Sequence, residues 1–200
     1  MYQEVFLTIR HSVYNFSMRK VMLLAGITLD GCIARPDGSV DYLSMTKEGS
    51  AEITRFFSTV DTIIMGRKTL DVVIALGGGA YKSPVKAPTY VFSRKEPPGE
   101  RDGVIFTNQS PAAWLRKIRA RRGKHVAHMG GGELARSFLQ ADLIDELYLG
   151  VVPILLGSGL PLFPSGFPQR EFTLIENKAY SKGLLSLTYE RARSKPKRKS

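Results

Sequence analysis

Residues 125–134 read His-Val-Ala-His-Met-Gly-Gly-Gly-Glu-Leu. A short apolar run over 125–129 ends in three glycines, and helical spacing follows from Glu133 to Gln140. This order predicts a buried strand, a tight turn and the N-terminus of a helix. Free backbone N–H groups and the helix dipole favour a phosphate at such a junction. The stretch therefore predicts an α/β fold with a candidate anion site.

A second junction of the same form lies earlier in the chain. Met65-Gly66-Arg67-Lys68-Thr69 follows a predicted strand over 62–65 and opens a predicted helix over 67–73. The junction adds two cations and a hydroxyl donor, while the glycines of the first junction let a ligand approach the backbone. Neither junction fits the Rossmann fingerprint or the P-loop pattern. Tight turns alone explain either junction, but the two together suit a diphosphate.

A third feature lies between the two junctions. Ser93 and Arg94 directly follow a predicted strand over 89–92, at the carboxyl end where α/β sheets bind ligands. A hydroxyl and a guanidinium there suit a ribose 2′-phosphate, which favours NADP over NAD, with an ordinary loop as the alternative.

The rest of the chain continues the alternation of strands and helices. Ser110 and Pro111 predict an N-cap and first turn, and Gly123 is expected to stop that helix. Residues 155–163 are expected to form a Gly/Pro-rich turn. Further strands are predicted at 21–25, 104–106, 125–129, 146–152, 172–179 and 183–191, and further helices at 47–58, 112–122 and 133–140. The pattern predicts one strand-rich α/β domain whose last two strands are antiparallel.

Composition and length favour a single globular domain. The chain has 200 residues, 43% of them apolar and 24% charged. Its one cysteine, Cys32, excludes an internal disulfide framework and a structural zinc cluster, so a reducing, cytoplasmic location is expected. The uncharged segment 147–163 is interrupted by Gly and Pro and does not supply the ~20 consecutive apolar residues of a membrane span.

The charge of the chain is concentrated at its C-terminus. The formal net charge is +11, and residues 191–200 carry six of the positive charges without an acid. We expect a solvated basic tail there, a domain over 18–190, and an N-terminal extension over 1–17 unless Met18 is the true start. The basic helix near residues 116–124 is expected to be solvated surface, with nucleic-acid binding as the alternative.

Six motifs in this order resemble the dihydrofolate reductase-like family, which includes the C-terminal reductase domain of bacterial riboflavin biosynthesis proteins. The motifs are residues 25–34, 37–38, 65–69, 92–94, 130–134 and 152–159. The resemblance spans roughly residues 18–190. It implies an α/β fold with a central, mostly parallel sheet of about eight strands flanked by helices, a C-terminal antiparallel hairpin and an NADPH cleft. It also implies a homodimer, to which residues 147–163 would contribute.

The resemblance implies a cofactor site on the matching positions. Ala25 and Ile33 would flank the nicotinamide, and Gly31 would lie in a mobile loop beside it. The phosphates of NADPH would be held by Gly66, Arg67, Lys68 and Thr69; by Ser93 and Arg94 for the 2′-phosphate; and by Gly130, Gly131, Gly132, Glu133 and Leu134 for the diphosphate. Phe92 is a further cofactor-binding position.

The implied chemistry is hydride transfer from NADPH to a small heterocycle, with a carboxylic acid as one candidate proton relay. Asp30 and Asp41 are the catalytic candidates, and Asp41, Glu48 and Glu52 the substrate-binding ones. A turn role for Asp30 and a surface-loop role for Asp41 are the alternatives.

The substrate and the occurrence of catalysis stay open. Riboflavin-pathway reductases carry Asp-Pro-x-Leu where this chain has Asp71-Val72-Val73-Ile74. Reduction of a ribosylaminopyrimidine is the preferred assignment, and reduction of dihydrofolate is the next. A nucleotide sensor without catalysis is a further alternative. His11, His125 and His128 lack the spacing of metal ligands, so no metal is expected.

Overall fold

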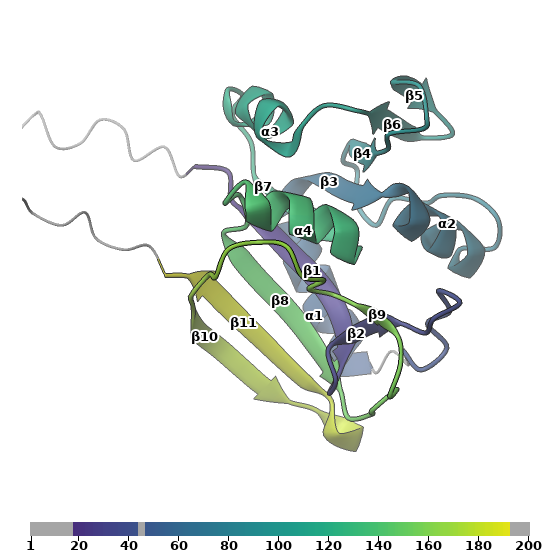
Figure 1. Cartoon of the computed structure of the whole chain (residues 1–200), viewed down its shortest axis with the longest axis vertical. Helices are drawn as coiled ribbons and strands as arrows, with labels where there is room; N and C mark the ends of the chain where they lie inside the picture. Colours follow the sequence, from purple (N-terminus) through teal and green to yellow (C-terminus); the bar gives the residue numbers. More distant parts are fainter. Residues whose placement is uncertain (1–17, 44–46, 193–200) are drawn as a thin grey trace, which may run out of the picture.

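The computed structural model describes residues 18–43 and 47–192, and Figure 1 shows their arrangement around one large sheet. The sheet has nine strands in the order β10-β11-β8-β1-β7-β3-β4-β6-β5. The strands are β1 (Val21–Thr28), β3 (Val60–Gly66), β4 (Thr89–Phe92), β5 (Gly99–Arg101), β6 (Val104–Thr107), β7 (His125–Met129), β8 (Glu146–Val152), β10 (Phe172–Ala179) and β11 (Leu185–Arg191). The six central strands, from β8 to β6, are parallel, while β10, β11 and β5 run antiparallel to their neighbours.

Helices cover both faces of this sheet, with α4 in front of the strands and α1 behind them in Figure 1. The helices are α1 (Lys47–Ser58), α2 (Arg67–Leu76), α3 (Pro111–Arg119) and α4 (Gly132–Gln140), with a single 3-10 turn at Ser181–Gly183. One core contains Trp114 of α3 and Phe138 of α4, and the other contains Phe56 of α1 and Leu70 of α2. Parallel strands need this cover because both of their faces are apolar.

A small second sheet pairs β2 (Cys32–Ala34) with β9 (Leu160–Pro161). The N–H of Leu162 also donates to the carbonyl of Gly31 at 3.0 Å. The loop after β1 is therefore joined to the loop after β8 by backbone pairing.

The structure confirms the predicted fold class, a mostly parallel α/β sheet with a C-terminal antiparallel hairpin, and gives it nine strands. Four strands, β4, β7, β8 and β10, and the helix α1 have the predicted bounds. The first strand continues to Thr28, three residues beyond the prediction. The second hairpin strand begins at Leu185, because residues 181–183 form the 3-10 turn.

The structure also corrects several local predictions. Ser110 caps α3 as expected by accepting from the N–H of Ala113, but the helix ends at Arg119 and not at Gly123. Its end is fixed from outside, because the Arg19 guanidinium donates to the carbonyl of Ile118 at 3.2 Å. The short strands β2 and β5 were not predicted, and β9 lies inside the segment expected to be only a turn.

The remaining expectations concern the two ends of the chain, the segment 147–163 and membrane-spanning helices. The expected N-terminal extension, and residues 193–200 of the basic tail, lie outside the described residues. Within the segment 147–163, Leu147 and Leu149 are buried in the sheet, where β8 lies between β1 and β11. In the described part of the chain, no helix is long and apolar enough to cross a membrane.

Candidate functional site

The carboxyl ends of three neighbouring strands are aligned. Gly66 at the end of β3 pairs with Phe92 of β4, and Phe92 pairs with Thr107 of β6. The N–H of Ser93 donates to the carbonyl of Thr107 at 3.0 Å, which extends this alignment by one residue. Arg67, directly after Gly66, therefore lies beside Ser93 at the edge where parallel sheets bind ligands.

The helices that begin at this edge differ in how their N-termini are capped. Among the described residues, no side chain caps α2 at Gly66 or α4 at Gly131, whereas Ser110 caps α3. A helix N-terminus presents backbone N–H groups that need an acceptor. The first turns of α2 and α4 are therefore suited to receive phosphate oxygens.

The glycines at these two junctions leave room for such a ligand. An added Cβ at Gly66 or Gly130 would meet no atom within 4 Å. Gly130 and Gly131 have φ of +43° and +77°, which residues with a side chain rarely adopt. An added Cβ at Gly131 would lie 2.9 Å from the Thr69 hydroxyl of α2. The two junctions predicted separately from the sequence thus meet in one place.

A cavity of about 1660 Å³ opens at these strand ends. It is lined by every predicted cofactor residue except Gly31: Ala25, Ile33, Gly66, Arg67, Lys68, Thr69, Phe92, Ser93, Arg94, Gly130, Gly131, Gly132, Glu133 and Leu134. Gly31 instead forms a turn in which its N–H donates to the carbonyl of Thr28 at 2.9 Å. The cavity, called the cleft below, is large enough for a dinucleotide together with a small ring compound.

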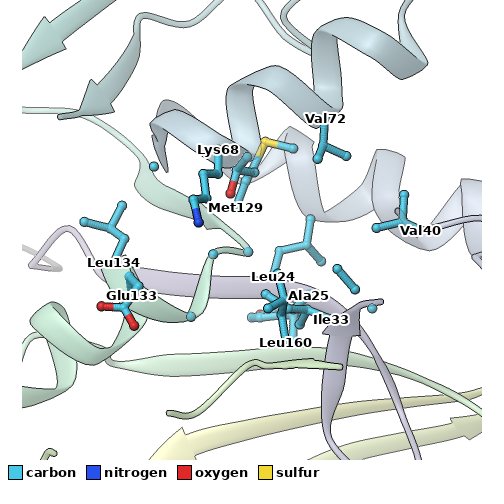
Figure 2. A pocket seen from close by; sticks show the side chains of 18 of the residues that line it. Leu24, Ala25, Ile33, Val40, Lys68, Val72, Met129, Glu133, Leu134 and Leu160 are labelled. Carbon is cyan, nitrogen blue, oxygen red and sulfur yellow. The ribbon is translucent and has the colours of Figure 1, made fainter. Parts of the chain in front are cut away.

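The middle of the cleft is apolar. Figure 2 shows Leu24, Ala25 and Ile33 close to Leu160, with Val40 and Val72 on the opposite side. Lys68 extends toward this region from the start of α2. An apolar surface in the middle of the cleft, with polar residues at its ends, suits a flat ring that carries charged groups.

The two acids predicted to be catalytic do not line the cleft. The Asp30 carboxylate accepts from the backbone N–H of Leu156 at 3.1 Å and of Gly157 at 2.9 Å, and the Thr28 hydroxyl also donates to it. These hydrogen bonds, led by that from Thr28, lower the pKa of Asp30. Asp30 therefore joins the loop after β1 to the loop after β8.

Asp41 and Glu48 also lie away from the cleft lining. Asp41 is exposed and accepts from Arg35 Nε at 2.7 Å, and this hydrogen bond lowers its pKa. Glu48 is an exposed residue in the first turn of α1. Of the predicted substrate-binding acids, only Glu52 lines the cleft.

Glu52 belongs to a closed ring of ion pairs, the charge quartet, that joins α1 to β10. Glu52 pairs with Lys178 at 2.8 Å and with Arg55 at 2.7 Å. Glu176 pairs with the same two cations, at 3.2 Å and 3.1 Å. The hydrogen bond from Lys178 is the main cause of the lowered pKa of both carboxyl groups. Both are therefore ionised near neutral pH.

The strands β8 and β11 form one side of the cleft, which was not predicted from the sequence. Tyr148 and Gly150 of β8 line the cleft beside Thr188 and Ser186, their paired residues in β11. Alternation along both predicted strands places each pair on one face, and this was the signal available in the sequence. The Tyr148 hydroxyl donates to Glu146 at 2.9 Å, and burial raises its pKa. It is held as a neutral phenol.

Comparison with known proteins agrees with this geometry. The model of the RibD C-terminal domain family matches residues 19–186. The uncharacterized protein YwjB of Bacillus subtilis is 34% identical over 176 residues, which are 87% of this chain and 99% of that protein.

Solved structures show the same fold. A putative riboflavin biosynthesis protein from Shewanella sp. PV-4 is 28% identical with a TM-score of 0.75, over 87% of this chain and 99% of that one. A deaminase and 5-amino-6-(5-phosphoribosylamino)uracil reductase from Thermotoga maritima is 17% identical with a TM-score of 0.65, over 88% of this chain and 57% of that one. The chain belongs to the RibD C-terminal domain family and has its reductase-like fold.

Proposed function

We propose that this protein is an NADPH-dependent oxidoreductase that reduces a small heterocyclic substrate. The observation that carries the proposal is the convergence of two uncapped helix N-termini and the Ser93–Arg94 turn on one cleft with an apolar middle. Backbone amides and cations at one end suit the phosphates of a dinucleotide. The apolar middle suits two stacked rings from which water is excluded.

The residues of the cleft have distinct roles in this proposal. The first turns of α2 and α4 would bind the diphosphate, and Arg67, Ser93 and Arg94 the 2′-phosphate. Ala25 and Ile33 would pack against the nicotinamide. Bound NADPH would supply the hydride that reduces a C=N or C=O bond of the substrate.

The preferred substrate class is a ribosylaminopyrimidine of the riboflavin pathway, because this is the reaction named for the Thermotoga maritima relative of the same fold. A dihydrofolate or pteridine is the second candidate. The helix α2 presents Asp71 and Val72 to the cleft, in place of the Asp-Pro-x-Leu element of riboflavin-pathway reductases. Screening both classes by NADPH oxidation separates them.

Calorimetric titration with NADPH and NADH tests the cofactor assignment. The wild type is expected to prefer NADPH, and both Arg67→Ala and the double variant Ser93→Ala/Arg94→Ala are expected to weaken that binding. Equal or tighter binding of NADH by the wild type would contradict NADPH selectivity. Selective NADPH binding without oxidation by any substrate of the two classes would favour the nucleotide sensor.

We also propose a homodimer. The accessible apolar side chains of the segment 147–163 are in the loop after β8, where Leu155 is 70% and Phe163 38% exposed. Light scattering behind size-exclusion chromatography measures the mass in solution. A monomer at micromolar concentration would contradict the proposal.

A further inference from the structure

An acidic side chain lies among the cations at the proposed 2′-phosphate end of the cleft. Glu96 lines the cleft from the loop after β4. One of its carboxylate oxygens, Oε1, is 3.6 Å from Nε of Arg67, and the other, Oε2, accepts from Arg101 at 3.0 Å. Glu96 is therefore held between two arginines.

The arginine on the outer side of Glu96 is fixed in place. The Arg101 guanidinium lies over the Phe106 ring, 3.9 Å from its centre, and donates to the carbonyl of Pro97 at 2.9 Å. Arg101 does not line the cleft. Because this partner is anchored, the Glu96 carboxylate is oriented with its remaining oxygen toward Arg67.

Arg67 is thus balanced by acids on two sides. Besides Glu96, it forms an ion pair with Asp71 one turn further along α2. A guanidinium that already faces two carboxylates offers a phosphate less net attraction than a guanidinium without such partners. Arg67, one of the cations proposed to bind the 2′-phosphate, is therefore partly neutralised.

The loop geometry puts Glu96 within the same turn as the proposed phosphate ligands. The Ser93 hydroxyl oxygen accepts from the backbone N–H of Lys95 at 3.2 Å and of Glu96 at 3.1 Å. The side chains of Ser93 and Glu96 are therefore held in one compact turn beside Arg67. A phosphate near neutral pH carries about −1.5 to −2 charges and is repelled by a carboxylate, whereas a ribose hydroxyl is neutral.

We propose that Glu96 is a specificity-determining residue that limits the preference of this cleft for a 2′-phosphorylated nucleotide. Its carboxylate competes with the 2′-phosphate for Arg67, so it lowers the affinity for NADPH and leaves the affinity for NADH nearly unchanged. This inference rests on the proposed function, because it assumes that the cleft binds a nicotinamide dinucleotide at these residues.

The test is calorimetric titration of the full chain with NADPH, NADH, adenosine 2′,5′-bisphosphate and 5′-AMP. Glu96→Gln is expected to tighten NADPH and the bisphosphate by roughly three- to tenfold at low salt, and to leave NADH and 5′-AMP within about twofold. The matched control is Glu100→Gln, which removes the same charge from an exposed residue of β5 outside the cleft. This control is expected to change none of the four affinities by more than about twofold.

The effect of Glu96→Gln on ligand affinity is also measured in an Arg67→Gln protein, which shows whether Glu96 acts through Arg67. In an Arg67→Gln protein, adding Glu96→Gln is expected to change the preference for the bisphosphate over 5′-AMP by less than about twofold. If the single variant Glu96→Gln has an unchanged or lowered preference for the bisphosphate over 5′-AMP, the inference is overturned. Glu96 would then serve only to hold Arg67. Failure of the wild type to bind any of the four ligands would contradict the proposed function itself, and the inference with it. Far-ultraviolet circular dichroism verifies that each variant is folded.

Discussion

The Thr69 hydroxyl lies 2.9 Å from the position that a Cβ on Gly131 would occupy. Thr69 is in the first turn of α2, and Gly131 is the N-cap of α4. The contact leaves no space for a side chain between the two helix starts. The N-termini proposed to share a diphosphate are therefore as close as a glycine allows.

Gly131→Ala is expected to weaken NADPH binding by at least about tenfold, because the new methyl group would separate the two helix starts. The substitution also places alanine at a φ of +77°, a strain of about 1–2 kcal/mol. Gly78→Ala is the matched control, since Gly78 has a φ of +78° with nothing within 4 Å of an added Cβ. The two variants are expected to lose similar stability, while calorimetry shows weaker NADPH binding in Gly131→Ala than in Gly78→Ala. Equal NADPH affinities would contradict it.

Asp30→Asn is expected to lower the midpoint of thermal unfolding and to leave NADPH affinity within about twofold. The reason is that the Asp30 carboxylate joins two loops through the N–H groups of Leu156 and Gly157, outside the cleft lining. Thermal scans and titration measure the two effects separately. A variant with wild-type stability that no longer binds NADPH would show that Asp30 acts in the site.

Stability is expected to fall in acid because of His128, which is fully buried and packs edge-on against Phe138. Burial lowers its pKa from 6.5 to about 4. The unfolded chain therefore binds a proton that the folded chain does not, so the loss begins as the pH falls below about 6.5 and is complete near 4. At pH 4.5 the loss from this group is on the order of 3 kcal/mol.

The measurement is urea unfolding of the wild type and His128→Leu at pH 7.5 and 4.5. The leucine variant is expected to lose less stability than the wild type between these pH values, whatever its stability at pH 7.5. Identical losses in both proteins would show that other groups cause the acid sensitivity.

Glu52→Gln is expected to reduce the free energy of unfolding by less than about 1 kcal/mol, because the charge quartet is partly exposed. The pKa of Glu52 is lowered in the folded chain, so the contribution is present above the unfolded pKa and is lost as the pH falls through the folded one. Urea unfolding at low and high salt measures it, and the effect should shrink with salt. Glu48→Gln, on the exposed start of α1, is the control. An equal loss in both variants would contradict a role for the quartet.

The parts of the fold predicted best are those whose signals are local. The strand His125–Met129 is an apolar run that ends in glycine, and its bounds match the structure. The two-residue strand β9 has no periodicity to detect, and it forms because Leu160 pairs with Ala34 far away in the sequence. A strand of this kind depends on tertiary pairing and not on its own residues.

The same contrast between local signals and long-range contacts applies to the candidate site. Gly66 and Gly130 mark strand-to-helix junctions, so these two junctions could be predicted from short motifs. The charge quartet joins Glu52 to Lys178 across 126 positions, and Asp30 reaches Leu156 across the same separation. No local pattern contains such contacts, so the partners of these acidic side chains could not be predicted from the sequence.

The pairing of β2 with β9 has a mechanical consequence. Pro161 of β9 contacts the start of α4 so closely that its carbonyl oxygen is 2.4 Å from where a Cβ on Gly132 would lie. On its other side, the same residue pairs with Cys32, next to the cleft residue Ile33. The start of α4 and the loop that carries Ile33 therefore share contacts with the same short strand. A ligand bound at the start of α4 would therefore be connected through β9 to the loop that carries Ile33.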